Sequence, residues 1–202
     1  MFGAGDSVHL AHEIERAIGD GGAGLLSFGL AGGLEPGLVP GTLVLAREII
    51  VGAERFATDG AWTRRLGAAL PRSIERTVAG IGTPAASVAA KAELHRSTGA
   101  ATVDMESHLA ARAAARAGLP VAAIRAIADP AEQALPPAAL AGLRRDGRAD
   151  LAGVMGALAR HPAQLPALIA VARNARAALA ALAAARKLLG AGFGLPLHPT
   201  DA

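Results

Sequence analysis

One stretch of the sequence, residues 97–130, limits the fold more than any other because it reads as a strand, a helix and a second strand. The apolar run 100–103 is typical of a buried strand, and Asp104 is a favourable N-cap for a helix over 105–117. The apolar run 121–127 predicts the second strand. Strands that alternate with helices predict an α/β fold, with a mostly parallel central sheet and helices on both faces.

The same alternation extends through the rest of the chain. Apolar residues at helical spacing predict a first helix over 7–18. Strands are expected at 24–30, at 42–46 with an extension over 49–51, and within 76–82; further helices are expected at 61–70, 84–97, 136–144, 151–160 and 162–189, with a charged loop over 52–62 and a loose tail from 190. We therefore predict one α/β domain over 1–160 and a C-terminal helical extension and tail over 161–202.

Composition excludes several classes of protein. A chain of 202 residues can bury one substantial core. Hydrophobic residues make up 52% of it but aromatic residues only 2%, so Ala, Leu, Val and Ile must fill that core. The absence of Cys excludes disulfides and thiolate metal sites, and the six His residues show no metal-ligand spacing. A net charge of +3 without a basic block argues against a dedicated nucleic-acid binder.

Targeting signals are not evident in the sequence. The first residues show no basic segment followed by an apolar one, so no signal peptide is expected. No apolar run is expected to span a membrane, because arginines interrupt the Ala-rich C-terminal run. A cytoplasmic, soluble protein is predicted. The helix over 163–189 could lie on the inner membrane surface as a peripheral contact, but packing against the sheet or a partner subunit is favoured.

Two acidic residues follow the predicted strands, at the edge where open α/β sheets bind ligands. Asp129 lies beside Pro130 among apolar neighbours, which could raise its pKa and let it donate a proton to a leaving group. An Asp-Pro turn explains the same residue equally well. Glu106 falls in the first helical turn, where the helix dipole is expected to lower its pKa, and the ionised carboxylate could accept hydrogen bonds from the two hydroxyls of a ribose. A surface Glu that stabilises the helix dipole is the commoner explanation.

Two further features lie near these acids. Met105 could pack on a sugar, although a core position is the more frequent role of such a residue. The glycine-rich run 29–33 follows a predicted strand and would let the backbone approach a ligand closely. By itself this run is weak evidence, because it does not match the dinucleotide-binding pattern.

Three motifs in combination resemble the purine nucleoside phosphorylase and methylthioadenosine nucleosidase superfamily. They are Gly29-Leu-Ala-Gly-Gly-Leu34 followed by Pro40-Gly41-Thr-Leu-Val44, then Val103-Asp-Met-Glu-Ser107, then Ile124-Arg-Ala-Ile-Ala-Asp129. Within the superfamily, segments such as Lys91-Ala-Glu-Leu-His95 and Leu135-Pro-Pro-Ala-Ala-Leu140 are similar to the hopanoid-associated phosphorylases. That family is associated with removing adenine from adenosylhopane during hopanoid biosynthesis.

The resemblance implies roles for five residues. Asp129 corresponds to the general acid that protonates N7 of adenine, and Glu106 to the acid that binds the 2′- and 3′-hydroxyls of the ribose. Met105 would pack beneath the sugar, while Ala31 and Gly32 would line the site near the nucleoside. The resemblance implies no metal or organic cofactor, inorganic phosphate as a co-substrate if the reaction is phosphorolysis, and a homo-oligomer.

The N-terminus departs from the pattern of the superfamily. Its members begin with a strand whose loop supplies either phosphate-binding residues or a water-activating glutamate, whereas this sequence begins with a helix. The first strand is thus expected to be lacking, and the nucleophile, phosphate or water, is left open. Two alternatives also stay open: a purine nucleoside or methylthioadenosine salvage enzyme, and a truncated, non-catalytic module that binds a nucleoside or lipid.

Overall fold

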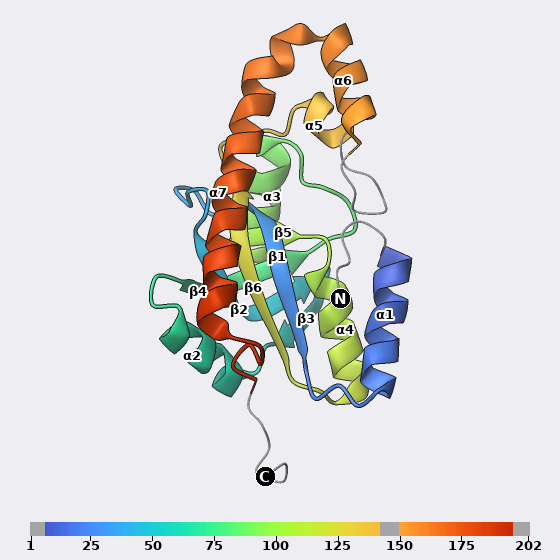
Figure 1. The fold of residues 1–202 in the computed structure, drawn as a ribbon, viewed down its shortest axis with the longest axis vertical. Helices are drawn as coiled ribbons and strands as arrows, with labels where there is room; N and C mark the ends of the chain where they lie inside the picture. Colours follow the sequence, from blue (N-terminus) through green and yellow to red (C-terminus); the bar gives the residue numbers. More distant parts are fainter. Residues whose placement is uncertain (1–6, 142–149, 196–202) are drawn as a thin grey trace.

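A six-stranded sheet forms the centre of the computed structural model, which describes residues 7–141 and 150–195 (Figure 1). The strands are β1 (Leu25–Gly33), β2 (Leu43–Val51), β3 (Glu54–Ala57), β4 (Ile74–Gly80), β5 (Thr102–Asp104) and β6 (Val121–Asp129). They pair in the order β3-β2-β4-β5-β1-β6, and β2 also pairs with β6. This additional pairing closes β2, β4, β5, β1 and β6 into a ring.

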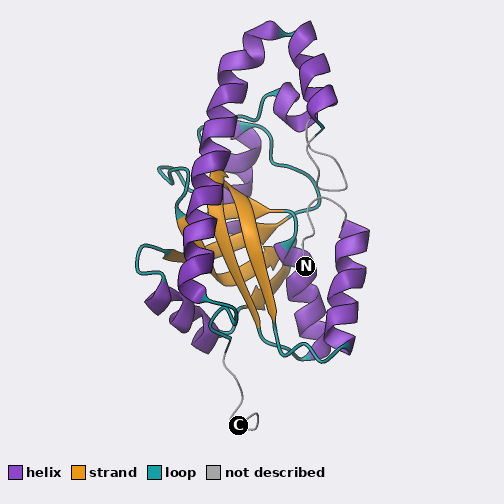
Figure 2. Cartoon of the chain, in the orientation of Figure 1, coloured by secondary structure: helices purple, strands orange, loops and turns teal. Residues whose placement is uncertain are grey.

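The predicted α/β class is confirmed, and helices cover the sheet on both faces (Figure 2). In Figure 1, α7 runs along one face of the sheet, while α4 packs on the other face with α1 beside it. The helices are α1 (Ser7–Gly19), α2 (Gly60–Ala69), α3 (Val88–Thr98), α4 (Ser107–Ala117), α5 (Pro137–Ala141), α6 (Leu151–Arg160) and α7 (Leu165–Leu189), with a 3-10 turn η1 (Pro162–Gln164) before α7.

The sheet is mixed: antiparallel pairs accompany the parallel pairs that the sequence predicts. The pairs β1–β6, β2–β4 and β4–β5 are parallel, whereas β1–β5, β2–β3 and β2–β6 are antiparallel. Part of the antiparallel pairing is local, because Gly52 reverses the chain with a φ of 61° and lets 54–57 pair with β2. The charged segment expected to be a loop therefore contains β3. The β2–β6 pairing joins residues more than 75 positions apart, which no local pattern predicts.

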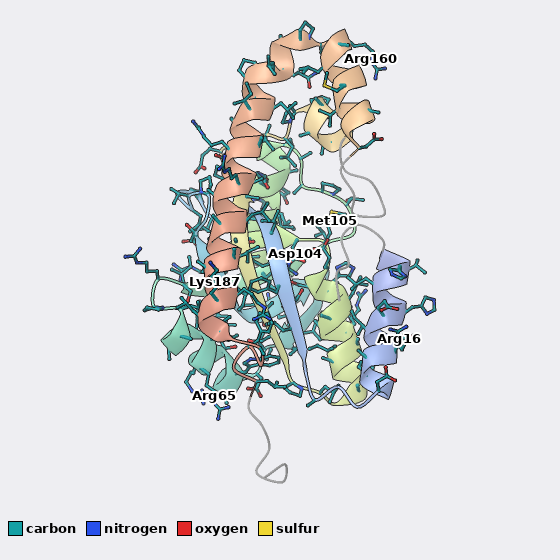
Figure 3. The ribbon with its side chains drawn as sticks, in the orientation of Figure 1. Arg16, Arg65, Asp104, Met105, Arg160 and Lys187 are labelled. Carbon is teal, nitrogen blue, oxygen red and sulfur yellow. The ribbon has the colours of Figure 1, made fainter. Side chains whose placement is uncertain are left out.

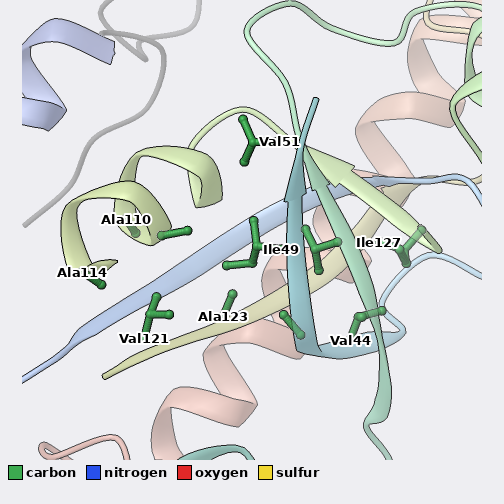
Figure 4. Packing of buried hydrophobic residues seen from close by; sticks show 11 residues of the cluster. Val44, Ile49, Val51, Ala110, Ala114, Val121, Ala123 and Ile127 are labelled. Atoms are coloured by element: carbon green, nitrogen blue, oxygen red, sulfur yellow. The ribbon is translucent and has the colours of Figure 1, made fainter. Parts of the chain in front are cut away.

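Alternation along β6 divides the core between the two faces of the sheet. Val121 and Ala123 point toward α4 and join one apolar cluster (Figure 4). Ala122 and Ile124 point the other way, toward α2 and α7, and pack with Trp62. Because successive side chains of a strand point to opposite faces, one strand supplies both halves of the core. The small Ala side chains of α4 let that helix lie close to the sheet.

The long helix α7 packs on the sheet with only part of its surface. Ala178, Leu182 and Ala185 are its buried residues, and they contact β6 or the α2 side of the core. Packing against the sheet, the favoured expectation, is thus confirmed for this face. By length and composition alone, Pro162–Leu189 could nevertheless cross a membrane, which corrects the expectation that its arginines rule this out.

Some sequence expectations concern residues outside the described ranges. These expectations are the end of the helix over 136–144 and most of the tail after 190. The expectation about a strand before α1 also concerns residues outside the described ranges. The division into 1–160 and 161–202 stays a prediction.

Gly80, the last residue of β4, provides a test of this packing. A Cβ built there would lie 2.6 Å from the Cβ and 3.0 Å from the backbone nitrogen of His108, at the start of α4. We expect Gly80→Ala to lower the free energy of unfolding by about 1–3 kcal/mol, measured by urea denaturation, since β4 and α4 must move apart.

Gly67→Ala is the matched control. Gly67 lies in α2, and the nearest atom to a new Cβ, on Leu45, is 3.7 Å away. Alanine should stabilise that helix by up to about 1 kcal/mol. Equal effects of the two substitutions would contradict the close approach of α4 to β4.

Candidate active site

A buried ion pair joins β6 to the start of α4. The Arg125 side chain, 2% exposed, reaches from the middle of β6, and its Nε lies 2.9 Å from Oδ2 of Asp104 at the end of β5. The guanidinium also donates to the hydroxyls of Ser107 and Ser27. The Ser107 hydroxyl in turn donates to Asp104 Oδ2 at 2.5 Å. Strands β1, β5 and β6 are thereby connected to α4 through one cation.

Asp104 also determines where α4 begins. Its Oδ1 accepts hydrogen bonds from the backbone N–H groups of Glu106 and Ser107, at 2.8 and 2.6 Å. The helix consequently starts at Ser107, two residues later than the sequence indicates. Figure 3 shows Asp104 and Met105 beside the central strands, where α4 begins.

Glu106 therefore occupies the N-cap position of α4 and not its first turn, which corrects the sequence expectation. Its side chain is partly buried, and its Oε2 lies 4.0 Å from Arg125 Nη1. Burial raises the pKa of Glu106 above its ordinary value, and the charge of Arg125 acts in the opposite direction. Nearby Asp104 adds to the rise. Desolvation thus raises a pKa that the sequence led us to expect below its ordinary value.

Asp129 lies at the end of β6, and its side chain is 14% exposed. Lys91 of α3 places its Nζ 2.5 Å from Asp129 Oδ2, and the Lys91 side chain is completely buried. Burial raises the pKa of the Asp129 carboxyl, while the hydrogen bond and the charge of Lys91 oppose that rise. The direction agrees with the sequence expectation for a partly desolvated acid.

An irregularity in β6 places Asp129 beside the glycine-rich strand. Arg125 pairs with Gly29 and Ile127 with Ala31, but the next partner of β1, Gly32, faces Asp129, so Ala128 is an extra residue. Such bulges re-aim a side chain and are frequent near active sites. A Cβ on Gly32 would lie 3.1 Å from Asp129 Oδ2, so the absence of a side chain leaves this carboxyl uncovered on that side.

The predicted site residues thus lie around one strand, β1. Asp129 neighbours Gly32, while Glu106 neighbours the Arg125 guanidinium, which approaches Gly29. Gly29 and Gly32 are three residues apart on β1, a distance of about 10 Å along the strand. The acids contact different cations, and no ion pair or hydrogen bond joins them directly among the described residues. Ala31 is buried and Met105 is half-buried at the same end of the sheet.

A hollow of about 400 Å³ lies elsewhere, at the opposite end of β6. Phe56, Pro120 and Val121 are among its lining residues, and none of the five candidate residues lines it. Among the described residues, no cluster of three or more His, Asp or Glu side chains could hold a metal ion.

Sequence reasoning missed two cations that organise these acids. Arg125 lies within the family-like segment 124–129 and Lys91 within the segment 91–95. Neither residue was assigned a role from the sequence. A signal was available for Arg125, because an arginine within the apolar run of a buried strand requires an anionic partner. For Lys91 no local signal exists, since its partners lie 38 or more residues away.

This fold, a mixed sheet closed by a β2–β6 pairing and covered by helices, is that of nucleoside phosphorylases and nucleosidases. A family profile described as "Phosphorylase superfamily" matches residues 7–185. The chain belongs to the phosphorylase superfamily. No curated protein sequence matches it.

Solved structures support the fold at low sequence identity. An S-adenosylhomocysteine nucleosidase from Streptococcus pyogenes matches with a TM-score of 0.59 and 17% identity, over 63% of this chain and 64% of that one. A futalosine hydrolase from Helicobacter pylori matches with a TM-score of 0.59 and 18% identity, over 76% of each chain. A putative methylthioadenosine nucleosidase from Weissella paramesenteroides matches with the same score and identity, over 89% of this chain and 77% of that one. The chain spans less than two thirds of the streptococcal protein.

The buried pair of Arg125 and Asp104 makes a prediction for stability. We expect Arg125→Met to lower the free energy of unfolding by about 3–5 kcal/mol, because the substitution leaves the Asp104 carboxylate buried without a cation. Urea denaturation measures the effect.

Arg112→Met is the control for this experiment. Arg112 forms an ion pair with Glu54, but both side chains are about half exposed. Its loss should change stability by less than about 1 kcal/mol. If both variants lose the same stability, the pair of Arg125 and Asp104 does not anchor the sheet.

Proposed function

We propose that this protein cleaves the N-glycosidic bond of an adenosine-type nucleoside and releases the free base. The observation that carries the proposal is the Asp129 carboxyl, a partly buried acid with a raised pKa at the carboxyl end of β6. Membership of the phosphorylase superfamily supports it. Desolvation that raises the pKa of a carboxyl increases the fraction that still carries a proton for a leaving group.

In the proposed step, the proton of Asp129 moves to N7 of adenine as the bond between C1′ and N9 breaks. The bonding electron pair leaves with the base, and the ribose develops oxocarbenium character. A phosphate or a water molecule then forms the new bond to C1′, and the proton that this nucleophile loses restores the acid form of Asp129. The reaction requires no metal ion and no organic cofactor, and phosphate is a co-substrate only if it is the nucleophile.

The other candidate residues would bind the nucleoside. Glu106 would accept hydrogen bonds from the 2′- and 3′-hydroxyls, and the charge of Arg125 would keep more of it ionised than burial alone allows. Met105 would pack beneath the sugar. Ala31 and Gly32 would line the site near the nucleoside, and at Gly32 no side chain fills the space beside Asp129.

Adenosylhopane is the substrate that we propose, on the motifs shared with the hopanoid-associated phosphorylases. The second candidate is a salvage reaction on another nucleoside. It is favoured by the names of similar structures, which include nucleosidases for methylthioadenosine and S-adenosylhomocysteine and a futalosine hydrolase. Both candidates share the proton transfer from Asp129.

Asp129→Asn tests the proposed acid. We expect wild-type protein to release adenine from adenosylhopane faster than from 5′-methylthioadenosine, measured by chromatography with and without phosphate. An amide cannot donate the proton, so Asp129→Asn should lower kcat by about 10²–10⁴-fold and leave nucleoside binding in place. Dependence on phosphate identifies the nucleophile.

The matched control is Asp59→Asn. Asp59 caps α2 with its side chain, and asparagine caps a helix equally well. This variant should turn over normally. Normal turnover by Asp129→Asn would show that another group is the acid, and binding without turnover in the wild type would favour the non-catalytic alternative.

We also propose a cytoplasmic homo-oligomer with a peripheral membrane contact through α7. Leu165, Ile169 and Leu179 on this helix are each about half exposed. Residues 151–195 contain no Asp or Glu but several arginines, among them Arg173 and Arg176. If two copies paired through this surface, their arginines would face one another without acidic partners. An anionic lipid surface therefore suits it better.

Vesicle flotation tests the membrane contact. Wild-type protein should float with vesicles that contain anionic phospholipid, less so in high salt, and not with neutral phosphatidylcholine vesicles. Ile169→Glu should weaken this binding. Val39→Glu, the same change at an exposed apolar residue outside α7, should not. Equal loss in both variants, or no flotation of the wild type, would contradict the contact.

A further inference from the structure

Lys91 is the one lysine of α3, and its environment is unusual for this residue type. Its side chain is completely buried, although lysine almost never is unless its charge is paired. The Nζ lies 2.5 Å from Asp129 Oδ2 and donates to the backbone carbonyls of Pro130 and Gln133, each at 2.8 Å. An ammonium has three hydrogens, so these three acceptors satisfy it completely.

These contacts fix the carboxyl of Asp129 in a defined orientation. The carbonyls of Pro130 and Gln133 belong to the segment after β6, so Lys91 ties that segment and the Asp129 side chain to α3. Lys91 occupies only Oδ2 of the carboxyl. Within the described part of the chain, no hydrogen bond is made to Oδ1. The second oxygen is therefore available to carry a proton.

We propose that Lys91 is a positioning residue for the acid: it holds one oxygen of Asp129 and stabilises the carboxylate that forms when the other oxygen gives up its proton. This inference rests on the proposed function. The proton passes from Oδ1 of Asp129 to N7 of the base, the C1′–N9 electron pair leaves with the base, and the new carboxylate remains paired with the Lys91 ammonium.

Burial has two opposite effects on a general acid, and the charge of Lys91 offsets one of them. A desolvated carboxyl stays protonated, but it also releases its proton reluctantly, because the charged product is equally desolvated. A fixed ammonium at 2.5 Å stabilises that product without solvent reorganisation. Burial raises the pKa of Asp129 and Lys91 limits the rise, which suits a group that must hold a proton and then lose it.

The other charged groups near Asp129 each have a partner of their own. On β6 itself, Arg125 is paired with Asp104, and β1 has no titratable side chain. Glu106, from the segment between β5 and α4, has Arg125 as its nearest cation. In the segment after β6, Glu132 accepts a hydrogen bond from the backbone of Gly37, and the charge of Lys91 also acts on it. Lys91 is therefore the cation to test.

The test combines a direct titration with kinetics of the full chain. The signal of Asp129 in ¹³Cγ-aspartate NMR is identified by its loss in Asp129→Asn, and its pKa is measured in wild type and Lys91→Met. Without the ammonium, we expect this pKa to rise. The acid must be protonated, so kcat/KM falls as pH rises through its pKa. The falling limb of the pH profile should then move to higher pH in Lys91→Met.

The kinetic constants should separate positioning from general damage. We expect Lys91→Met to lower kcat at neutral pH by at least about tenfold, but by no more than Asp129→Asn, with little change in KM. The double variant Lys91→Met/Asp129→Asn should be no slower than Asp129→Asn alone, because Lys91 acts through that carboxyl. Lys91→Gln, which keeps a hydrogen-bond donor without the charge, should show the same direction of the pH shift.

A purely structural role for Lys91 predicts other results. It predicts an unchanged pH limb and a double variant slower than either single variant, and either outcome overturns the proposal. If Lys91→Met does not fold, Lys91→Gln and the double variant, which has no unpaired buried charge, carry the test. If the wild type releases no base from any nucleoside, the proposed function fails, and an unchanged Asp129 pKa in the NMR titration separately overturns the role of Lys91.

Discussion

The buried pair of Arg125 and Asp104 is the interaction on which the rest of the structure depends. Both side chains are almost completely removed from water, so each charge is tolerable only because the other lies 2.9 Å away. The same guanidinium bonds Ser27 and Ser107, which fixes β1, β5, β6 and the start of α4 relative to one another. Gly29 is part of this arrangement, since a Cβ there would lie 2.6 Å from Arg125 Nη1.

A second buried cation repeats this arrangement further along β1. Lys91 is to Asp129 what Arg125 is to Asp104, with backbone carbonyls in place of the serine hydroxyls. The two cations differ in what they leave accessible. Asp104 uses both oxygens within the protein, whereas Asp129 keeps one oxygen without a bond among the described residues. In the mechanism that we propose, that difference separates a structural acid from the acid that exchanges a proton.

The sequence predicted many of the elements but not their pairing. Local signals sufficed for α1, α2 and β6, because apolar periodicity and capping act over a few residues. They failed at β3, which looked like a charged loop because a short outer strand has little need of apolar residues. They also placed the start of α4 two residues too early, since Asp104 caps the helix from a buried strand end and not from the position before it. The pKa of Glu106 was expected to fall and instead rises, because burial depends on what packs over the side chain.

By itself, the sequence determined the α/β class, the superfamily and the two acids at the ends of their strands. The class and the position of the acids follow from the spacing of residues along the chain, and the superfamily follows from the resemblance of short motifs. Only the tertiary structure decided that the sheet is mixed and closed, and that Arg125 and Lys91 are the cations beside those acids. Each such contact joins residues about 20 to 80 positions apart, and its free energy depends on burial and direction, which the order of residues does not contain.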